Sequence, residues 1–147
     1  MEKNEILNKL APCGIDCSRC VSFKGGPVSL QSRELLEALG NFRVMADKMS
    51  SFFPPFRNYD SFEKILTHFA EAGCAGCRAG DGKYPGCEAK SCFQEKGVDF
   101  CGECNDFPCE RNDYNEGLRQ RWLKNGHSIR EKGAETFYLM QAEKPRY

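Results

Sequence analysis

The chain has 147 residues, of which 40% are hydrophobic and 29% charged, and its 21 basic residues balance its 21 acidic residues. Zero net charge gives no indication of a nucleic acid partner, because a general phosphate-binding surface needs an excess of Lys and Arg. The opening segment MEKNEILNKL lacks the apolar core of a secretory signal, and no apolar run approaches the roughly 18 residues of a membrane helix. We therefore expect a cytoplasmic protein with no membrane partner.

The first distinctive element is the stretch APCGIDCSRC, which holds Cys13, Cys17 and Cys20. The spacing of these cysteines is that of radical S-adenosylmethionine enzymes, in which three cysteines hold an iron–sulfur cluster. Such enzymes need a large α/β barrel, and this chain is too short and has too few strand signals for one. An iron–sulfur cluster stays the alternative to zinc, because sets of four cysteines bind either metal.

Two helical segments follow and form a predicted helical insertion over residues 30–72. The segment 32–49 is expected to break at Gly40–Asn41 and carries its apolar side chains on one side: Leu35, Leu36, Leu39, Phe42, Met45 and Met49. The segment 60–73 opens with the capping-box spacing of Asp60 and Glu63. Its apolar face, at i, i+3, i+4 and i+7, consists of Phe62, Ile65, Leu66 and Phe69.

An aromatic linker, SSFFPPFRNY, joins these two segments. Proline has no backbone N–H and restricts the residue before it, so Pro54–Pro55 is expected to exclude helix there. The aromatic side chains of the linker are expected to pack back on the helices, and they are Phe52, Phe53, Phe56 and Tyr59.

Seven more cysteines lie within residues 74–109, and the CxxC motif occurs three times in the chain. The two residues between the cysteines of a CxxC motif allow both thiolates to bind the same ion. A glycine in the motif, such as Gly76 or Gly102, allows backbone N–H groups to face the sulfurs. Zinc prefers four thiolates in a closed tetrahedron, so the sequence predicts about two zinc ions, with two cysteines left over. The ten candidate ligands are Cys13, Cys17, Cys20, Cys74, Cys77, Cys87, Cys92, Cys101, Cys104 and Cys109.

Local spacing favours a sequential grouping of these ligands, in which Cys74, Cys77, Cys87 and Cys92 form one site. The later cysteines, from 101 to 109, then need a fourth ligand from the CGIDCSRC loop, which would act as a clasp. The main rival pairs the CxxC motif at 74–77 with that at 101–104. Cys92 and Cys109 are both expected in the first turn of a helix, which suggests two similar modules in tandem.

The C-terminal region, residues 111–147, is predicted to be helical. A helix over NEGLRQRWLK is expected to end at Asn125–Gly126, and Ser128 with Glu131 has the spacing of a capping box that opens a last helix. The predicted fold is a small, mostly α, cysteine-rich metal-binding domain with helices packed beside zinc-knuckle-like CxxC loops and few short strands. We expect a single domain over residues 1–147, with its metal-binding region at 11–110.

Other uses of the thiols fit the sequence less well. A reducing cytosol disfavours disulfides, and a thioredoxin-like redox CxxC needs a βαβ context that is absent. DNA-reading zinc fingers pair two cysteines with two histidines, whereas neither His68 nor His127 has that context. The sequence identifies no catalytic residue, no Gly-rich phosphate loop and no HExxH motif.

The motifs APCGIDCSRC, CAGCRAG, GCEAKSCFQEKG and CGECNDFPCE together resemble an uncharacterised prokaryotic family known as domain of unknown function 3795. The resemblance runs from about Ala11 to Glu110, and the downstream RxRW segment is also similar. It implies metal binding, with zinc as the metal, and no established activity. Some relatives carry an additional cysteine just before the position of Cys87, where this chain has Tyr84, Pro85 and Gly86.

The expected function is therefore a zinc-binding structural, interaction or regulatory module, with another protein as one candidate partner. A structural zinc contributes on the order of 10 kcal/mol to folding, which rivals the stability of a whole domain. The alternatives are an iron–sulfur or thiol redox protein and an enzyme with one open zinc site. If the N-terminal loop acts as a clasp, loss of Cys17 or Cys20 should loosen the whole domain.

Overall fold

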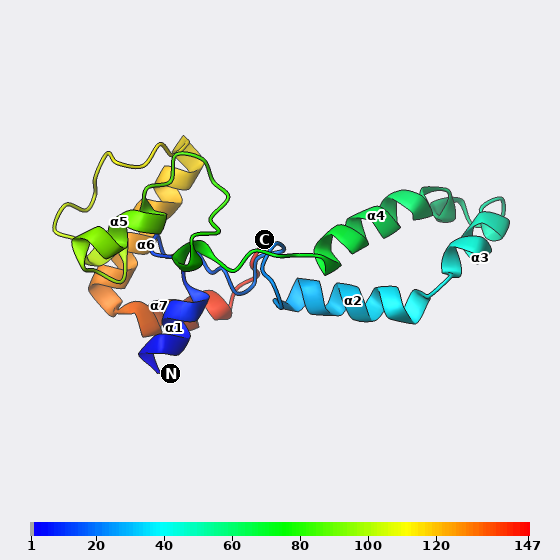
Figure 1. The fold of residues 1–147 in the computed structure, drawn as a ribbon, viewed down its shortest axis with the longest axis horizontal. Coiled ribbons are helices and arrows are strands. Elements are labelled where there is room, and N and C mark those ends of the chain that lie inside the picture. Colours follow the sequence, from blue (N-terminus) through cyan, green and yellow to red (C-terminus); the bar gives the residue numbers. More distant parts are fainter. Residues whose placement is uncertain (1) are drawn as a thin grey trace. The chain divides into compact units, whose positions relative to one another are not determined.

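The computed structural model describes residues 2–147, which form two compact units (Figure 1). The cysteine unit consists of residues 2–20 and 74–147 and contains all ten cysteines. The helical unit is the continuous segment Val21–Gly73. It includes the helical insertion predicted over residues 30–72, and the single domain predicted over the whole chain stays a prediction.

The cysteine unit is built from helices and short 3-10 turns. Its elements are α1 (Lys3–Lys9), η2 (Cys77–Ala79), α5 (Ala89–Lys96), η3 (Cys101–Glu103), α6 (Glu116–Lys132) and α7 (Ala134–Ala142). Residues 2–147 contain no strand, and Leu10 forms an isolated antiparallel bridge with Asp16. The mostly helical fold is confirmed. The third CxxC motif contains the 3-10 turn η3, and η2 begins at the last cysteine of the second motif, so neither of these two motifs forms one of the few short strands expected.

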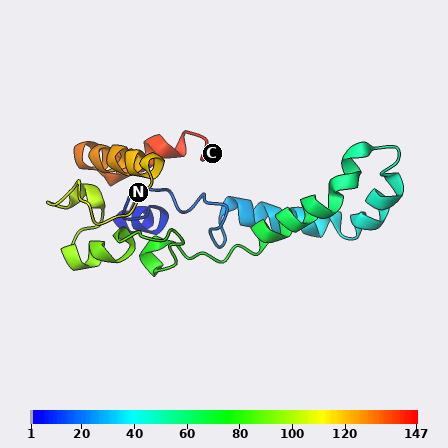
Figure 2. The same cartoon turned by 90° about the horizontal axis from the view of Figure 1, so that it is seen from above.

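Two clusters of buried side chains stabilise the cysteine unit. One joins α1, α6 and α7 and consists of Ile6, Leu10, Phe100, Ile129, Phe137 and Tyr138. The other surrounds Trp122 and Phe107, whose rings meet edge to face at 4.8 Å, and includes the buried Cys13 and Cys101. In Figure 2 the yellow and orange α6 and α7 lie on one side of this unit and the light green α5 on the opposite side. Cysteine side chains are thus part of the core.

Helix α6 does not end at Asn125–Gly126, and Ser128 lies inside it and caps no new helix. The helix starts at Asn115, whose side chain accepts the N–H of Leu118 at 2.9 Å, and runs to Lys132. The Asn-Gly pair is misleading because Gly126 is selected by packing: a Cβ on it would lie 2.3 Å from the ring of Phe107. A Cβ on Gly102 would likewise lie 2.2 Å from the carbonyl oxygen of Gly126.

The helical unit contains α2 (Pro27–Leu39), α3 (Phe42–Met49), η1 (Pro54–Asn58) and α4 (Tyr59–Ala70), with α2 packed along α4. The predicted break at Gly40–Asn41 is confirmed, since α2 ends and α3 begins there. The exclusion of helix at Pro54–Pro55 is wrong, because the two prolines start the 3-10 helix η1. Proline is tolerated in a first turn, where its missing N–H would have no helical partner.

The predicted apolar faces of α2 and α4 are rotated from the observed ones. Leu35, Phe62 and Ile65 are 42%, 43% and 56% exposed, whereas the buried residues include Ser29 and Ala70. Leu66, which belongs to the predicted face of α4, is buried as expected. Small side chains allow α2 and α4 to approach closely. Because such side chains can be polar, as serine is, they are not counted in an apolar periodicity, and the predicted face misses them. In the linker, Phe52 and Phe53 are exposed, and Phe56 and Tyr59 pack edge to face on Phe42.

The expected capping box of α4 is also absent, because the helix already starts at Tyr59. The two carboxylates instead form ion pairs on the surface of the helical unit. Arg43 pairs with both Asp60 and Glu63, and Lys64 pairs with Asp60. Such exposed pairs contribute little to stability.

The C-terminal end of α4 is tied to α2 by the carbonyl of Ala70, which accepts Arg33 Nε at 2.8 Å and Ser29 Oγ at 3.3 Å. We predict that Arg33→Ala destabilises the helical unit by about 1 kcal/mol, the usual net effect of one such hydrogen bond. Faster hydrogen exchange in peptides from α2 and α4 would report the loss. Gln31→Ala, an exposed change on the same helix, is the control, and equal exchange in both variants would contradict the prediction.

Candidate metal centre

Backbone hydrogen bonds join the N-terminal cysteine loop to the CGEC turn and fix the shape of both segments. The N–H of Cys101 donates to the carbonyl of Pro12 at 2.8 Å, which joins the CGEC turn to the N-terminal loop. The loop itself is fixed at Cys17, whose N–H donates to the carbonyl of Lys9 at 2.8 Å. The CxxC turns close on themselves in the same way, with the N–H of Cys104 donating to the carbonyl of Cys101 at 3.1 Å. Cysteines that lie far apart in the sequence therefore meet.

Four cysteines, which we call the cavity group, line a cavity of about 20 Å³. The group consists of Cys92, Cys101, Cys104 and Cys109, which come from α5, from η3 and its end, and from the following loop. The remaining wall is largely apolar, with Phe93, Val98, Phe107 and Trp122. A space of this size accommodates one water-sized particle and is far below the several hundred Å³ of an organic ligand site.

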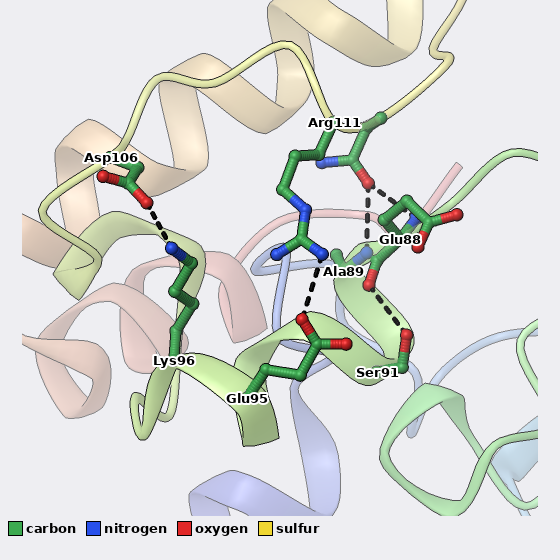
Figure 3. Close-up of polar contacts among 8 residues, drawn as sticks. Glu88, Ala89, Ser91, Glu95, Lys96, Asp106 and Arg111 are labelled. Carbon is green, nitrogen blue, oxygen red and sulfur yellow. Dashed lines mark hydrogen bonds and ion pairs between the residues drawn. The ribbon is translucent and has the colours of Figure 1, made fainter.

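Ion pairs hold α5 against the loop that supplies Cys104 and Cys109 (Figure 3). Arg111 donates to Glu95 at 3.0 Å, and Lys96 Nζ lies 2.5 Å from Asp106 Oδ2. The side-chain oxygen of Asn112 accepts the backbone N–H groups at the start of α5, at 2.9 and 3.0 Å. The wall that carries Cys92 is thereby held in place relative to the loop.

In the cavity group, burial raises the pKa of two thiols, and a nearby donor or positive charge opposes each rise. Burial raises the pKa of Cys101 to about 11, and the indole N–H of Trp122 opposes that rise by favouring the thiolate. Burial likewise raises the pKa of Cys92, and the positive charge of Arg111 opposes it. The Trp122 Nε1–H is buried and makes no hydrogen bond of normal geometry with any residue in 2–147. It is a donor available to a sulfur anion, which fits a thiolate–metal centre.

A second set, the loop group, consists of Cys13, Cys17, Cys77 and Cys87. A hydrogen bond from the Cys77 thiol lowers the pKa of Cys17 to about 6 and raises that of Cys77. Burial raises the pKa of Cys13 to about 12, and negative charge on Cys17 or Cys87 would raise it further. The Sγ of Cys87 lies 3.2 Å from the hydroxyl of Tyr114, and burial is the main cause that raises the pKa of that tyrosine. The pKa values of Cys13, Cys17 and Cys77 thus each depend on other cysteines, including members of this group.

The structure groups the cysteines differently from the sequential grouping that local spacing favours. Cys92 lines one cavity with the later cysteines, and the thiols of Cys13, Cys17 and Cys87 affect the pKa of Cys77. Which cysteines share a metal, including the rival pairing of the 74–77 and 101–104 motifs, stays a prediction. Cys92 lies in the first turn of α5 as expected, whereas Cys109 lies in an irregular loop, so the two tandem modules are not alike.

Cys20 and Cys74 belong to neither group. The Sγ of Cys74 accepts the N–H of Gly76 at 3.4 Å, the type of contact expected of a glycine in a CxxC turn. Across residues 2–147, no three Cys, His, Asp or Glu side chains are arranged as a metal site. Coordination in either group therefore requires the sulfurs to turn inward, and metal binding by the ten cysteines stays a prediction.

Several residues of the site were not identified as site residues from the sequence. Trp122, Tyr114 and Arg111 shape the sulfur environment, and their only signal was the proximity of aromatic and basic residues to the last cysteines. Aromatic residues at such positions are equally typical of core packing, so the sequence did not distinguish the two uses. None of the helices in the described chain has the length and apolar character needed to cross a membrane.

One family model, described as "Protein of unknown function (DUF3795)", matches residues 9–114. The matched segment starts at Lys9, just before the N-terminal cysteine loop, and ends after Cys109, so it includes all ten cysteines. No curated protein and no solved structure matches the chain.

Proposed function

The chain belongs to the family of proteins of unknown function DUF3795, and from that premise we propose that its cysteine unit is a structural zinc module. One zinc ion would be held by the cavity group and one by the loop group. The observation that carries this proposal is the cavity of about 20 Å³ with four cysteines around it and the buried Trp122 N–H in its wall.

The size of the cavity favours a single ion over an iron–sulfur cluster. A cluster contains several iron and sulfide atoms, whereas about 20 Å³ accommodates little more than one water-sized particle. Zinc has no geometric preference from its d electrons and is commonly bound by four thiolates at about 2.3 Å. Four sulfurs drawn inward around the cavity would satisfy that preference.

Four thiolate ligands favour a structural role over a catalytic one. A catalytic zinc keeps one position open for water or substrate, and each group offers enough cysteines to close the coordination shell. The metal would then replace apolar core, consistent with Cys13 and Cys101 lying in the cluster around Trp122. A module of this kind acts by presenting a fixed surface to another protein or by regulating it.

The proposal places the protein in the cytoplasm, where cysteines stay reduced and available as ligands. All ten cysteines are free thiols in the structure, as ligands must be. The same chemistry would operate in any reducing compartment.

A second candidate, a thiol redox centre, is favoured by one observation in the loop group. The hydrogen bond between Cys17 and Cys77 lowers the pKa of Cys17 to about 6, so this sulfur is a thiolate at neutral pH. Low-pKa thiolates are the usual redox-active cysteines. Rapid alkylation of Cys17 in metal-loaded protein would favour this second function, whereas protection by bound zinc would favour the first.

We predict about two zinc ions per chain in protein purified without oxygen, from the four-ligand rule. Elemental analysis gives the number, and X-ray absorption should give metal–sulfur distances of about 2.3 Å. Cys92→Ser should remove one ion and leave the other, which assigns the cavity group. A brown protein with iron and labile sulfide, or cysteines found as five disulfides, would overturn the proposal.

A further inference from the structure

A pocket of about 490 Å³ lies in the cysteine unit, separate from the cavity group. One wall is the loop from Gly14 to Arg19, another is α6, and the third is the segment from Gln141 to Arg146. Its volume lies in the usual range for small-molecule sites. Neither the zinc proposal nor the family assigns this pocket a role.

The walls of the pocket are joined by hydrogen bonds from one arginine. Arg19 donates to the carbonyls of Lys144 and Gln141, both at 2.8 Å, and its Nε lies 2.6 Å from Asp16 Oδ2. Arg146 Nε donates to the carbonyl of Asp16 at 3.2 Å. The C-terminal segment is therefore fastened to the N-terminal loop, and the pocket is a built feature of the unit.

The charge of the pocket is strongly unbalanced although the whole chain is neutral. Its lining contains five basic side chains and a single acidic one, Asp16, which Arg19 neutralises. Within the described chain, the cationic ends of Arg121, Lys124 and Lys144 form no ion pair or hydrogen bond. Three positive charges thus line the pocket in addition to Arg19, and Asp16 is the one acidic side chain in its lining.

A buried amide adds a neutral hydrogen-bonding group to the same wall. Asn125 is only 8% exposed and lines the pocket, so its amide is a polar group at the pocket wall. It lies on the same face of α6 as Arg121, four residues earlier. A Cβ on Gly14 would lie 2.8 Å from the Cβ of Asn125, so the glycine allows the loop to approach the helix here.

We propose that this pocket binds a phosphate monoester of small size. Near pH 7 a phosphate monoester carries close to two negative charges and three acceptor oxygens. Arg121, Lys124 and Lys144 supply the balancing charge, with a planar guanidinium suited to two phosphate oxygens at once. The Asn125 amide donates to a further oxygen or to a hydroxyl of the esterified group.

The pocket favours a small molecule over nucleic acid for two reasons. It is a bounded hollow of about 490 Å³ and not an extended groove. The chain also has no excess of basic residues, with 21 against 21 acidic ones, whereas a general phosphate-binding surface needs such an excess. The inference goes beyond the zinc module and does not depend on zinc being bound.

The test is calorimetric titration of the full chain with ribose 5-phosphate, inorganic phosphate and uncharged ribose. We expect both phosphate compounds to bind and ribose not to bind. Lys124→Gln with Lys144→Gln should weaken ribose 5-phosphate binding by about tenfold or more, the effect of losing charge-assisted contacts. Lys132→Gln, on the same helix but outside the pocket, should leave the affinity unchanged.

Because the two lysines are exposed, the double variant is expected to keep its circular dichroism spectrum and metal content, and Arg121→Gln offers an independent second variant. The proposal fails if the Kd for ribose 5-phosphate is above about 10 mM. Binding that weak corresponds to a smaller free energy than ordinary ligands have. Equal affinity in the double variant and in Lys132→Gln would also overturn it. Tighter binding of succinate or of a single-stranded oligonucleotide would assign the pocket to another class of ligand.

Discussion

Cys17→Ser is expected to lower the zinc content from about two ions to about one and to destabilise the cysteine unit by several kcal/mol. Cys17 lies in the loop group, hydrogen-bonded to Cys77, and its N–H is anchored on the carbonyl of Lys9. A structural zinc contributes on the order of 10 kcal/mol, comparable to the whole stability of a domain. Elemental analysis and thermal unfolding of the purified variant measure the two effects.

Cys20→Ser is the matched control, since it changes the other cysteine of the same CxxC motif. Sequence spacing treats both cysteines alike, but Cys20 belongs to neither group, so this variant should keep its metal and unfold within about 0.5 kcal/mol of the parent. Equal losses in the two variants would contradict the assignment of Cys20. If both variants keep all their metal and stability, the N-terminal loop is no clasp, and these thiols become candidates for redox or catalytic work.

Gly126→Ala is expected to destabilise the cysteine unit by about 2–4 kcal/mol, the range for overpacking a buried site. The added Cβ would lie 2.3 Å from the ring of Phe107. That ring already packs edge to face on the rings of Trp122 and His127, with ring centroids 4.8 and 5.2 Å away, so moving it would disturb both contacts. Helix propensity alone predicts the opposite sign, a gain of about 1 kcal/mol for glycine to alanine within a helix.

Gly117→Ala separates packing from propensity in the same helix. A Cβ at Gly117 would meet nothing closer than 3.7 Å, so this variant should be stabilised by about 0.5–1 kcal/mol. Urea unfolding followed by circular dichroism measures both variants under the same conditions. A Gly126→Ala protein as stable as Gly117→Ala would show that Phe107 relaxes and that the close approach is not required.

The sequence predicted most helices but not which faces they bury. Apolar spacing located the helices in 32–49 and 60–73, because the 3.6-residue period is a local property. The buried contact between α2 and α4 instead involves Ser29 beneath the carbonyl of Ala70, and a serine adds nothing to an apolar pattern. Gly126 was misinterpreted for the same reason, since its purpose is a contact with Phe107 from a distant part of the chain.

The candidate site was predictable in its chemistry and not in its geometry. Residue type and CxxC spacing identified the ten cysteines as candidate ligands, yet which thiols are neighbours depends on long-range contacts. The hydrogen bond between Cys101 and Pro12 is one such contact, and it places Cys13 beside the CGEC turn. No local rule anticipates that contact, or the buried N–H of Trp122.

The division of the chain into two units has a consequence for the order of events during translation. The helical unit, Val21–Gly73, is one continuous segment, so the ribosome completes it before any residue from 74 onward exists. We expect it to fold as it emerges, because it is a compact unit whose main helices are close in sequence. The N-terminal cysteines are made first but must wait for their partners. During that interval the nascent chain displays unpaired thiols, and oxidants or competing metals have access to them before the cysteine unit closes.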